Sequence, residues 1–275
     1  MDADCAPTIL KTQTKKKPLS RLITPAKLSP RSFPIVGFGA SAGGLEAFTS
    51  LLTHLNPKLG MAYVLIMHLS PKHKSALKEI LQAKTRMPVR KATNGMLVRP
   101  NHIYVVPPNS FMSLGNGKLK LSARTADNVG IDHFFAALAV NYKNNAIGVI
   151  LSGTATDGTQ GLKAIKAEGG ITFAQDDSAK FPRMPRNAFD AGVVDFRLSP
   201  EGIAEELDRL VTAPYTGLPP NKVELAHERP IENQTAELKK IVALVFVRPG
   251  VDFLAHYKRA SIFRRLLRRM VLAKI

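Results

Sequence analysis

The 275-residue chain has no tryptophan, a single cysteine and no long run of apolar residues. The lone Cys5 excludes a disulfide framework, and its polar surroundings do not favour a catalytic thiol. Apolar runs such as 134–140 and 241–247 reach only seven residues, far short of a membrane-spanning helix. The amino terminus also lacks an apolar signal segment. We therefore expect a cytoplasmic protein with no membrane insertion.

Acidic residues are scarce, since 21 Asp and Glu stand against 39 Lys and Arg, for a formal net charge of +18. The excess is greatest at the ends, with seven Lys and Arg against two Asp in 1–31 and seven against one Asp in 251–275. The middle shows no nucleic-acid-binding motif, so we expect no nucleic-acid partner. Lys15–Lys17 is interpreted as part of a solvated tail, and an acidic protein partner remains open.

The most informative stretch is a glycine-rich segment between a strand pattern and a helix pattern. Residues 34–38 are apolar, as in a buried strand, and from Gly44 to Leu55 the apolar residues recur at helical spacing. The glycines between them permit a sharp turn, which places the Ser41 hydroxyl beside the first N–H groups of the helix. Such N–H groups can stabilise a negatively charged oxygen.

Two kinds of site would use that turn. Residues 39–43 fit the Gly-x-Ser-x-Gly elbow of serine hydrolases, and 37–42 fit the relaxed glycine fingerprint of nucleotide-binding folds. A dinucleotide site needs an acidic residue at the end of the second strand, 62–67, where this chain has His68. A histidine is instead the base that a serine nucleophile needs. A turn that only packs helix on strand is the third interpretation.

A later strand-to-helix junction supplies a carboxylate, because a strand pattern over 146–151 leads into a turn that contains Asp157. The carboxyl ends of parallel strands meet at one edge of a sheet, so we expect Ser41, His68 and Asp157 to lie together. There Ser41 would attack a carbonyl carbon, His68 would take its proton, and Asp157 would orient the imidazole. Taken singly, Asp157 also fits a helix N-cap, and His68 also fits an ordinary histidine of the core or surface.

The remaining patterns complete an α/β fold class, a three-layer domain with a largely parallel sheet flanked by helices. The other expected elements are a helix after Pro71 that buries Leu77, Ile80 and Leu81, strands over 88–92 and 102–106, a hairpin over 111–121 that turns at 115–117, and a helix over 131–142.

These motifs together resemble the catalytic domain of the CheB family of chemotaxis protein-glutamate methylesterases, over roughly residues 33–211. The segments that carry the resemblance are Gly39–Gly44, His68 within Met67–Pro71, Gly153-x-x-x-Asp157-Gly158, Pro100–Pro107 and Met184–Arg186. The sequence differs from the family at Phe181-Pro182-Arg183, where a small glycine-containing turn is usual, and at Ala42, where threonine is frequent.

The resemblance implies that Ser41, His68 and Asp157 form a catalytic triad and that the backbone at Ala42 and Thr154 stabilises the oxyanion. It implies hydrolysis of glutamate γ-methyl esters on the cytoplasmic helices of methylated chemoreceptors, with release of methanol, and deamidation of receptor glutamines. No metal or organic cofactor is implied. The alternative function is a non-catalytic scaffold that docks on receptors or signalling proteins.

The expected domain organisation places the methylesterase-like domain at 31–211, after a disordered basic arm over 1–30 and before a linker over 212–235. Thirty residues cannot hold the receiver domain that precedes this domain in the family, so we expect no phosphorylation control within the chain. Residues 236–275 resemble the start of the CheR family of receptor methyltransferases, through Gly250–Lys258 and Arg264–Met270. We expect poorly ordered helices there, with a basic amphipathic helix as the alternative.

Overall fold

The computed structural model describes residues 33–67, 76–123, 130–212, 268–269 and 272–273. Its centre is a seven-stranded sheet in the order β3-β4-β2-β1-β7-β8-β9, in which every neighbouring pair is parallel. The strands are β1 (Ile35–Ala40), β2 (Ala62–Met67), β3 (Val89–Lys91), β4 (Ile103–Val105), β7 (Ala146–Ile150), β8 (Ile171–Gln175) and β9 (Phe196–Leu198). The expected α/β class is confirmed.

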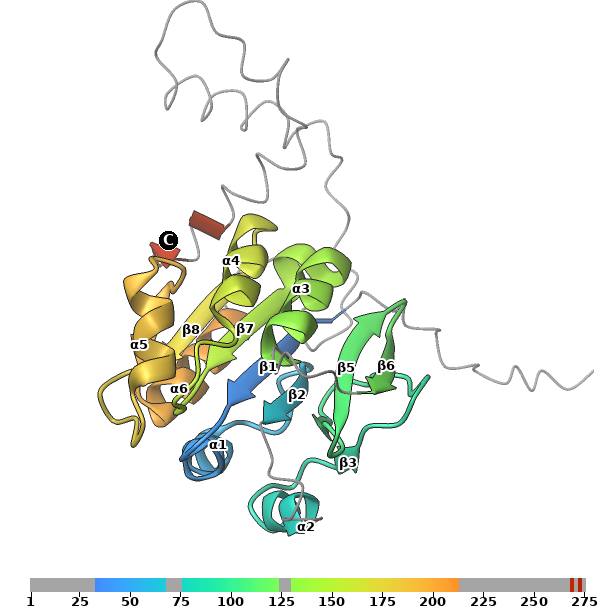
Figure 1. Cartoon of the computed structure of the whole chain (residues 1–275). Helices are drawn as coiled ribbons and strands as arrows, with labels where there is room; N and C mark the ends of the chain where they lie inside the picture. Colours follow the sequence, from blue (N-terminus) through green and yellow to red (C-terminus); the bar gives the residue numbers. More distant parts are fainter. Residues whose placement is uncertain (1–32, 68–75, 124–129, 213–267, 270–271, 274–275) are drawn as a thin grey trace, which may run out of the picture.

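Helices cover both faces of this sheet (Figure 1). The helices are α1 (Gly44–His54), α2 (Ala76–Gln82), α3 (Gly130–Tyr142), α4 (Thr159–Ala167), α5 (Arg183–Asp190) and α6 (Pro200–Thr212), with a 3-10 turn η1 (Lys143–Asn145). One buried cluster joins the sheet to α1, α2 and α6, and a second joins it to α3, α4 and α5. Strands β1, β2 and β7 are buried along their whole length, as expected for a parallel sheet covered on both sides.

A separate antiparallel hairpin, β5 (Ser110–Gly115) and β6 (Lys118–Ala123), packs into the second cluster. Its turn residues Asn116 and Gly117 have φ values of 51° and 73°. Two consecutive positive φ values are the requirement of the tight hairpin turn that asparagine–glycine sequences favour. The hairpin predicted from the sequence is therefore confirmed.

One burial expectation for α2 is wrong. Leu81 is fully buried and Leu77 is half-buried, but Ile80 is 40% exposed. Leu77 and Leu81 are four residues apart and share one face of the helix, whereas Ile80 lies about 100° from Leu81 around the axis. Because α2 covers only the edge of the sheet, a narrow stripe of its surface meets the core.

The order of the strands determines where a site can form. The strands β2, β3 and β4, which follow β1 in the chain, lie on one side of it, and the later strands β7, β8 and β9 lie on the other. Ligands of open α/β sheets bind outside the carboxyl ends of the strands at such a reversal. The turns that follow β1 and β7, which contain Ser41 and Asp157, therefore border the favoured position.

The predicted arm over 1–30 lies outside the described residues, as does nearly all of 236–275. Of the predicted linker over 212–235 only Thr212 is described, and it is the last residue of α6. One contact of the last segment is described. The Arg268 side chain donates a hydrogen bond of 2.9 Å to the Gly170 carbonyl and forms an ion pair with the buried Asp195 carboxylate. No helix within the described residues is long and apolar enough to span a membrane.

Candidate active site

Ser41 lies in the turn between β1 and α1, directly after the last residue of the strand. Its backbone N–H donates to the Ser152 carbonyl at 3.0 Å, and its own carbonyl accepts a 2.9 Å hydrogen bond from the Gly44 N–H. Ser41 is half-buried. The turn is thus fixed at both ends, with Ser41 held between β1 and the segment that follows β7.

Two glycines make this turn possible. Gly43 has a φ of 71°, and a Cβ added there would lie 2.7 Å from the Ser152 Oγ. A Cβ at Gly44 would lie 2.5 Å from the Ala40 Cβ, which is closer than side chains can pack. The turn therefore requires glycine at 43 for both backbone conformation and space, and at 44 for space, which explains the strand-turn-helix signal in the sequence.

Ser152 is the central hydrogen-bonding residue of the turn, although sequence reasoning did not single it out. Its side chain is fully buried. The hydroxyl donates to the Ala42 carbonyl at 2.8 Å and accepts from the Phe181 N–H at 3.0 Å. Its N–H donates to the Gln175 side-chain oxygen at 2.9 Å. Ser152 therefore connects the Ser41 turn to β8 and to the loop before α5.

The loop before α5 closes one side of Ser41. Gly153 and Phe181 are joined by a backbone hydrogen bond of 2.9 Å, and the Met184 N–H donates to the Gly153 carbonyl at 3.0 Å. A Cβ at Gly153 would lie 3.0 Å from the Ser41 Cβ and 2.6 Å from the Met184 Cε. Phe181 keeps 37% of its surface exposed beside this turn.

Asp157 is only 5% exposed, and its carboxylate accepts two backbone hydrogen bonds from the start of α3. The Ile131 N–H donates to Oδ2 at 2.9 Å, and the Asp132 N–H donates to Oδ1 at 2.8 Å. The interpretation of Asp157 as the N-cap of the following helix is wrong, because the α4 N-cap is Gly158, with no side-chain cap. Asp157 instead caps α3, a helix that begins 27 residues earlier in the chain.

Asp132 completes a reciprocal arrangement between the two helices. Its Oδ1 accepts a 2.6 Å hydrogen bond from the Gly161 N–H in the first turn of α4. Burial raises the pKa of the Asp132 carboxyl; the Gly161 N–H opposes this rise and the nearby Asp157 charge adds to it. Asp157 thus caps α3, the helix that contains Asp132, and Asp132 hydrogen-bonds the first turn of α4, the helix that follows Asp157.

Shared packing places the Ser41 strand and the Asp157 turn close together. A Cβ at Gly39 would lie 2.4 Å from the Ile131 side chain, and a Cβ at Gly158 would lie 2.9 Å from it. A Cβ added at either glycine would also lie within 3 Å of the Ile150 side chain. Glycines two residues before Ser41 and one after Asp157 therefore face the same pair of side chains.

The third predicted member, His68, lies outside the described residues. What is described is the residue before it, since Met67 ends β2 and pairs in register with Ala40, the residue before Ser41. The predicted meeting of Ser41 with His68 remains a prediction.

The two predicted oxyanion positions differ in exposure. Ala42 is half-buried, and its N–H donates no hydrogen bond to any atom of the described residues. Thr154 is exposed in the bend after Gly153. The N–H at Ala42 lies in the sharp turn that a hydrolase elbow uses for this purpose, so it is the better placed of the two.

Sequence reasoning missed three residues of this site: Ser152, Gln175 and Asp132. Ser152 follows closely on β7, and a small polar residue at the end of a buried strand is the only local signal it gives. The roles of Gln175 and Asp132 depend on contacts with residues more than 20 positions away. No local pattern reveals such contacts.

Comparison with known proteins matches residues 36–207 to the CheB methylesterase family. A protein-glutamate methylesterase/protein-glutamine glutaminase of Rhizobium meliloti is 32% identical over 181 residues, which cover 63% of this chain and 50% of that protein. A putative protein-glutamate methylesterase/protein-glutamine glutaminase of Leptospira interrogans is 32% identical over 185 residues, which cover 65% of this chain and 95% of that protein. The chain thus spans half of one relative and nearly all of the other.

Among solved structures, the Thermotoga maritima CheB methylesterase catalytic domain superposes with a TM-score of 0.61 at 27% sequence identity. The superposition covers 65% of this chain and 99% of that domain. The segment matched to the family includes the Ser41 turn, the Ser152 hydrogen bonds and the Asp157 cap. The chain belongs to the CheB methylesterase family.

Proposed function

We propose that the chain is a serine esterase that hydrolyses glutamate γ-methyl esters on the cytoplasmic helices of methylated chemoreceptors. The observation that carries this proposal is the Ser41 turn at the strand-order reversal, beside the buried Asp157, in a chain of the CheB methylesterase family. Relatives named for both methylesterase and glutaminase activity support deamidation of receptor glutamines as a second reaction of the same site.

In this proposal Ser41 Oγ attacks the γ-carbonyl carbon of the ester while its proton passes to His68. The tetrahedral intermediate collapses, the carbon–oxygen bond to methanol breaks, and methanol leaves with that proton. Water then attacks the acyl-serine, again losing a proton to His68, which returns it to Ser41 as glutamate is released. Asp157 holds the imidazole tautomer and stabilises its charged form. For glutamine the first leaving group is ammonia.

The contacts around Asp157 suit this role. Each carboxylate oxygen has about two acceptor positions, and the two N–H groups of α3 occupy one on each oxygen. The two hydrogen bonds hold the carboxylate in a fixed orientation, as is needed for a group that orients an imidazole.

The experiment is methanol release from a peptide that carries a glutamate γ-methyl ester, measured for the wild-type chain and for Ser41→Ala. We expect the substitution to lower the rate by about 10³-fold or more, with an unchanged thermal unfolding midpoint, because the Ser41 hydroxyl makes no hydrogen bond among the described residues. Methanol release by Ser41→Ala at the wild-type rate would refute Ser41 as the nucleophile.

The alternative function, a non-catalytic scaffold for receptors or signalling proteins, makes a different prediction. A scaffold would bind receptor helices equally well with or without the Ser41→Ala substitution, and neither form would release methanol. No contact within the described residues favours it over the esterase.

The rest of the predicted organisation is also proposed. We infer a methylesterase domain over 31–211, an arm and a linker on either side, and a partial CheR-type segment over 236–275. A cytoplasmic location follows from the proposed substrate. Expressing 31–211 alone and finding full methanol-releasing activity would support these boundaries, and an unfolded product would contradict them.

A further inference from the structure

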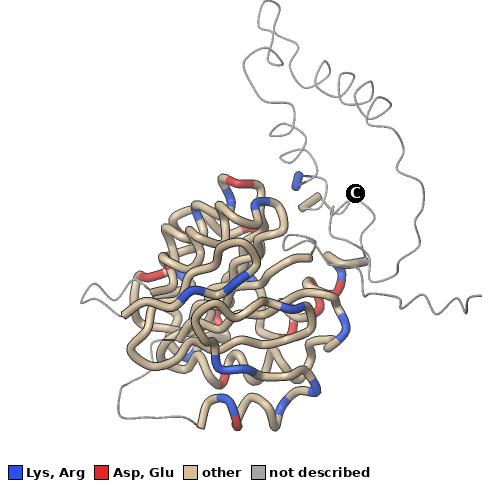
Figure 2. Tube along the Cα trace, turned by 90° about the vertical axis from the view of Figure 1, so that its right-hand side faces the viewer, with Lys and Arg blue, Asp and Glu red and all other residues tan. Residues whose placement is uncertain are grey.

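Charge is divided unevenly within the described part of the chain. Residues 76–123 carry eight Lys and Arg against one Glu, whereas 130–212 carry eight against eleven Asp and Glu. In Figure 2, basic residues lie along the lower part of the fold, where α2 is found. The segment 76–123, which contains α2, β3, β4 and the β5–β6 hairpin, is therefore the most positively charged of these segments.

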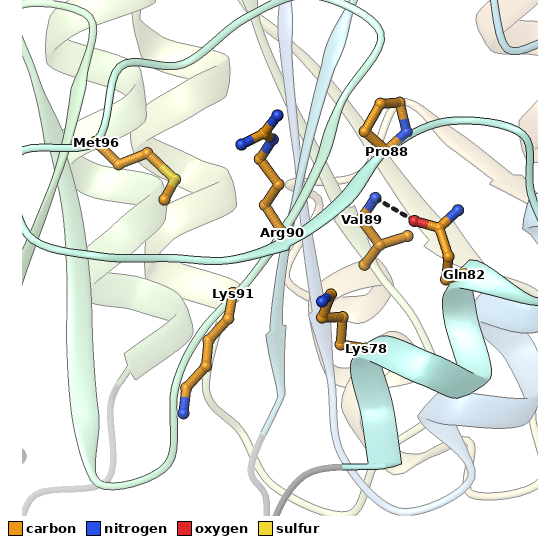
Figure 3. Close-up of a pocket in the computed structure, with 7 residues that line it drawn as sticks. All are labelled: Lys78, Gln82, Pro88, Val89, Arg90, Lys91 and Met96. Atoms are coloured by element: carbon orange, nitrogen blue, oxygen red, sulfur yellow. Dashed lines mark hydrogen bonds between the residues drawn. The ribbon is translucent and has the colours of Figure 1, made fainter.

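This region contains a groove of about 500 Å³, called here the edge groove. It follows the outer side of β3, which is the terminal strand of the described sheet. The residues that line it are Lys78, Gln82, Pro88, Val89, Arg90, Lys91 and Met96. Figure 3 shows Arg90 and Lys91 projecting to opposite sides of β3, with Lys78 directed toward the strand from α2. Three cations therefore surround the open edge of the sheet.

The wall of the edge groove is fixed, but its cations are not paired. The Gln82 side chain accepts from the Val89 N–H at 2.9 Å and donates to the Met87 carbonyl at 3.0 Å, which ties α2 to β3. Lys78, Arg90 and Lys91 are exposed. None of the three forms an ion pair or hydrogen bond with another residue that the structure describes.

The edge groove lies at a definite distance from Ser41. Strand β3 is three strands away from β1, which is about 14 Å at the usual spacing. Pairing through Val105 and Leu65 sets Lys91 level with Phe38, three residues before Ser41, or about 10 Å along the strand. The two sites are therefore about 17 Å apart, the length of about eleven residues of α-helix.

We propose that the edge groove docks an acidic helical segment of the methyl-esterified protein substrate, about three helical turns away from the ester that reaches Ser41. The inference rests on the proposed function, because it assigns a second contact to that substrate. Carboxylates of the segment pair with Lys78, Arg90 and Lys91, and its apolar side chains contact Pro88 and Met96. Each hydrolysis adds a carboxylate to the helix and so strengthens docking of the next site along it.

Two other roles for these cations lead to different expectations. Nucleic acid would also be attracted by positive charge, but the groove lining contains no aromatic side chain on which a base could stack. Charged side chains on an edge strand also prevent unwanted pairing of sheets, and in that role they would not discriminate between partners of different charge.

The test is direct binding of a fluorescent, helical, glutamate-rich peptide to the full chain with Ser41→Ala, which removes turnover. The groove variant is Lys78→Gln with Lys91→Gln. The matched control is Lys143→Gln with Lys163→Gln, two exposed lysines outside the groove. Surface ion pairs are weak, so we expect the dissociation constant to rise about three- to tenfold in the groove variant and less than about twofold in the control.

Salt and peptide charge provide the second readout. The difference between groove and control variants should disappear at about 1 M salt, where the screening length is only about 3 Å, and with a peptide that has glutamine in place of glutamate. Equal effects in both variants would overturn the proposal, as would equal binding of the two peptides. Tighter binding of a DNA duplex, lost only in the groove variant, would overturn it in favour of nucleic acid.

A kinetic arm keeps this inference separate from the proposed function. In the active chain, the ratio of kcat/KM for an esterified acidic peptide to that for a small blocked glutamyl methyl ester should fall about three- to tenfold in the groove variant. The fall should arise from KM and should be absent in the control variant. If neither ester is hydrolysed, the proposed function fails, while the binding arm still tests the edge groove.

Discussion

The centre of the sheet and its β3 edge are built from the same chain in opposite ways. Around β1 and β7 the polar groups are buried and hydrogen-bonded, as Ser152 and Asp157 show. At the β3 edge Lys78, Arg90 and Lys91 are exposed and form no ion pair or hydrogen bond with a described residue. Glycines follow the same division, because a Cβ would collide at Gly43 but meets nothing within 4 Å at Gly95.

This difference separates chemistry from recognition. A catalytic group must be held within a few tenths of an ångström, which needs packed neighbours and satisfied hydrogen bonds. A docking surface needs charge and access, and a fixed geometry adds little to it. Substitutions at the centre should therefore change rate and stability, whereas those at the edge should change affinity.

The largest effect is expected at Asp157. Asp157→Asn and Asp157→Ala should both lower the rate of methanol release by about 10⁴-fold, because the imidazole loses its partner. Urea unfolding should separate them: the alanine variant loses the cap of α3, at about 1–2 kcal/mol, while asparagine keeps one oxygen acceptor. An asparagine variant within about tenfold of wild-type activity would remove Asp157 from the mechanism.

A matched pair of glycines compares centre and edge directly. Gly43 and Gly95 have φ values of 71° and 79°, so alanine costs about 1–2 kcal/mol of backbone strain at either. Only at Gly43 does the new Cβ approach another atom, the Ser152 Oγ at 2.7 Å, which adds about 1–3 kcal/mol. Urea unfolding should therefore show a larger loss of stability for Gly43→Ala. Equal losses of stability would mean that the packing around Gly43 adjusts to the new methyl group at no extra cost.

Ser152→Ala tests the hydrogen bonds that join the Ser41 turn to the α5 loop. It leaves the Ala42 carbonyl and the Phe181 N–H without their partner, at a cost of about 1–3 kcal/mol in the free energy of unfolding. The exposed Ser122 on β6 supplies the control, and Ser122→Ala should stay within about 0.5 kcal/mol of wild type. A loss no greater than that of the control would contradict the role given to Ser152.

The smallest effect concerns pH. Because the native pKa of Asp132 is raised, the folded protein binds that proton more tightly than the unfolded chain does. Its contribution to stability is therefore lost as pH rises from the ordinary carboxyl pKa through the raised one. Asp132→Asn keeps an oxygen acceptor for the Gly161 N–H, and in urea titrations from about pH 3 to 8 its stability should fall less over that window. If the variant and the wild-type chain had the same dependence of stability on pH, the pKa of Asp132 would not be raised in the folded protein.

Much of the centre could be predicted from local sequence. The Ser41 turn was found because a buried strand, glycines and a helical stripe follow one another along a short stretch of chain. The α3 cap could not be predicted in this way, because Asp157 accepts a hydrogen bond from backbone 25 residues away. The local pattern suggested instead that Asp157 caps the helix that follows it. The edge groove was not predicted either, since Lys78 and Arg90 line one groove only after α2 packs on β3.

The most direct test of the central claim is mass spectrometry of the chain after reaction with a serine-directed phosphonate that mimics the ester. The account predicts one adduct, located on Ser41 by fragmentation. In the wild-type chain, methanol release should fall in step with the formation of this adduct, and in Asp157→Asn the adduct should form more slowly. An adduct on another residue, or full methanol release from protein that is completely labelled at Ser41, would contradict it.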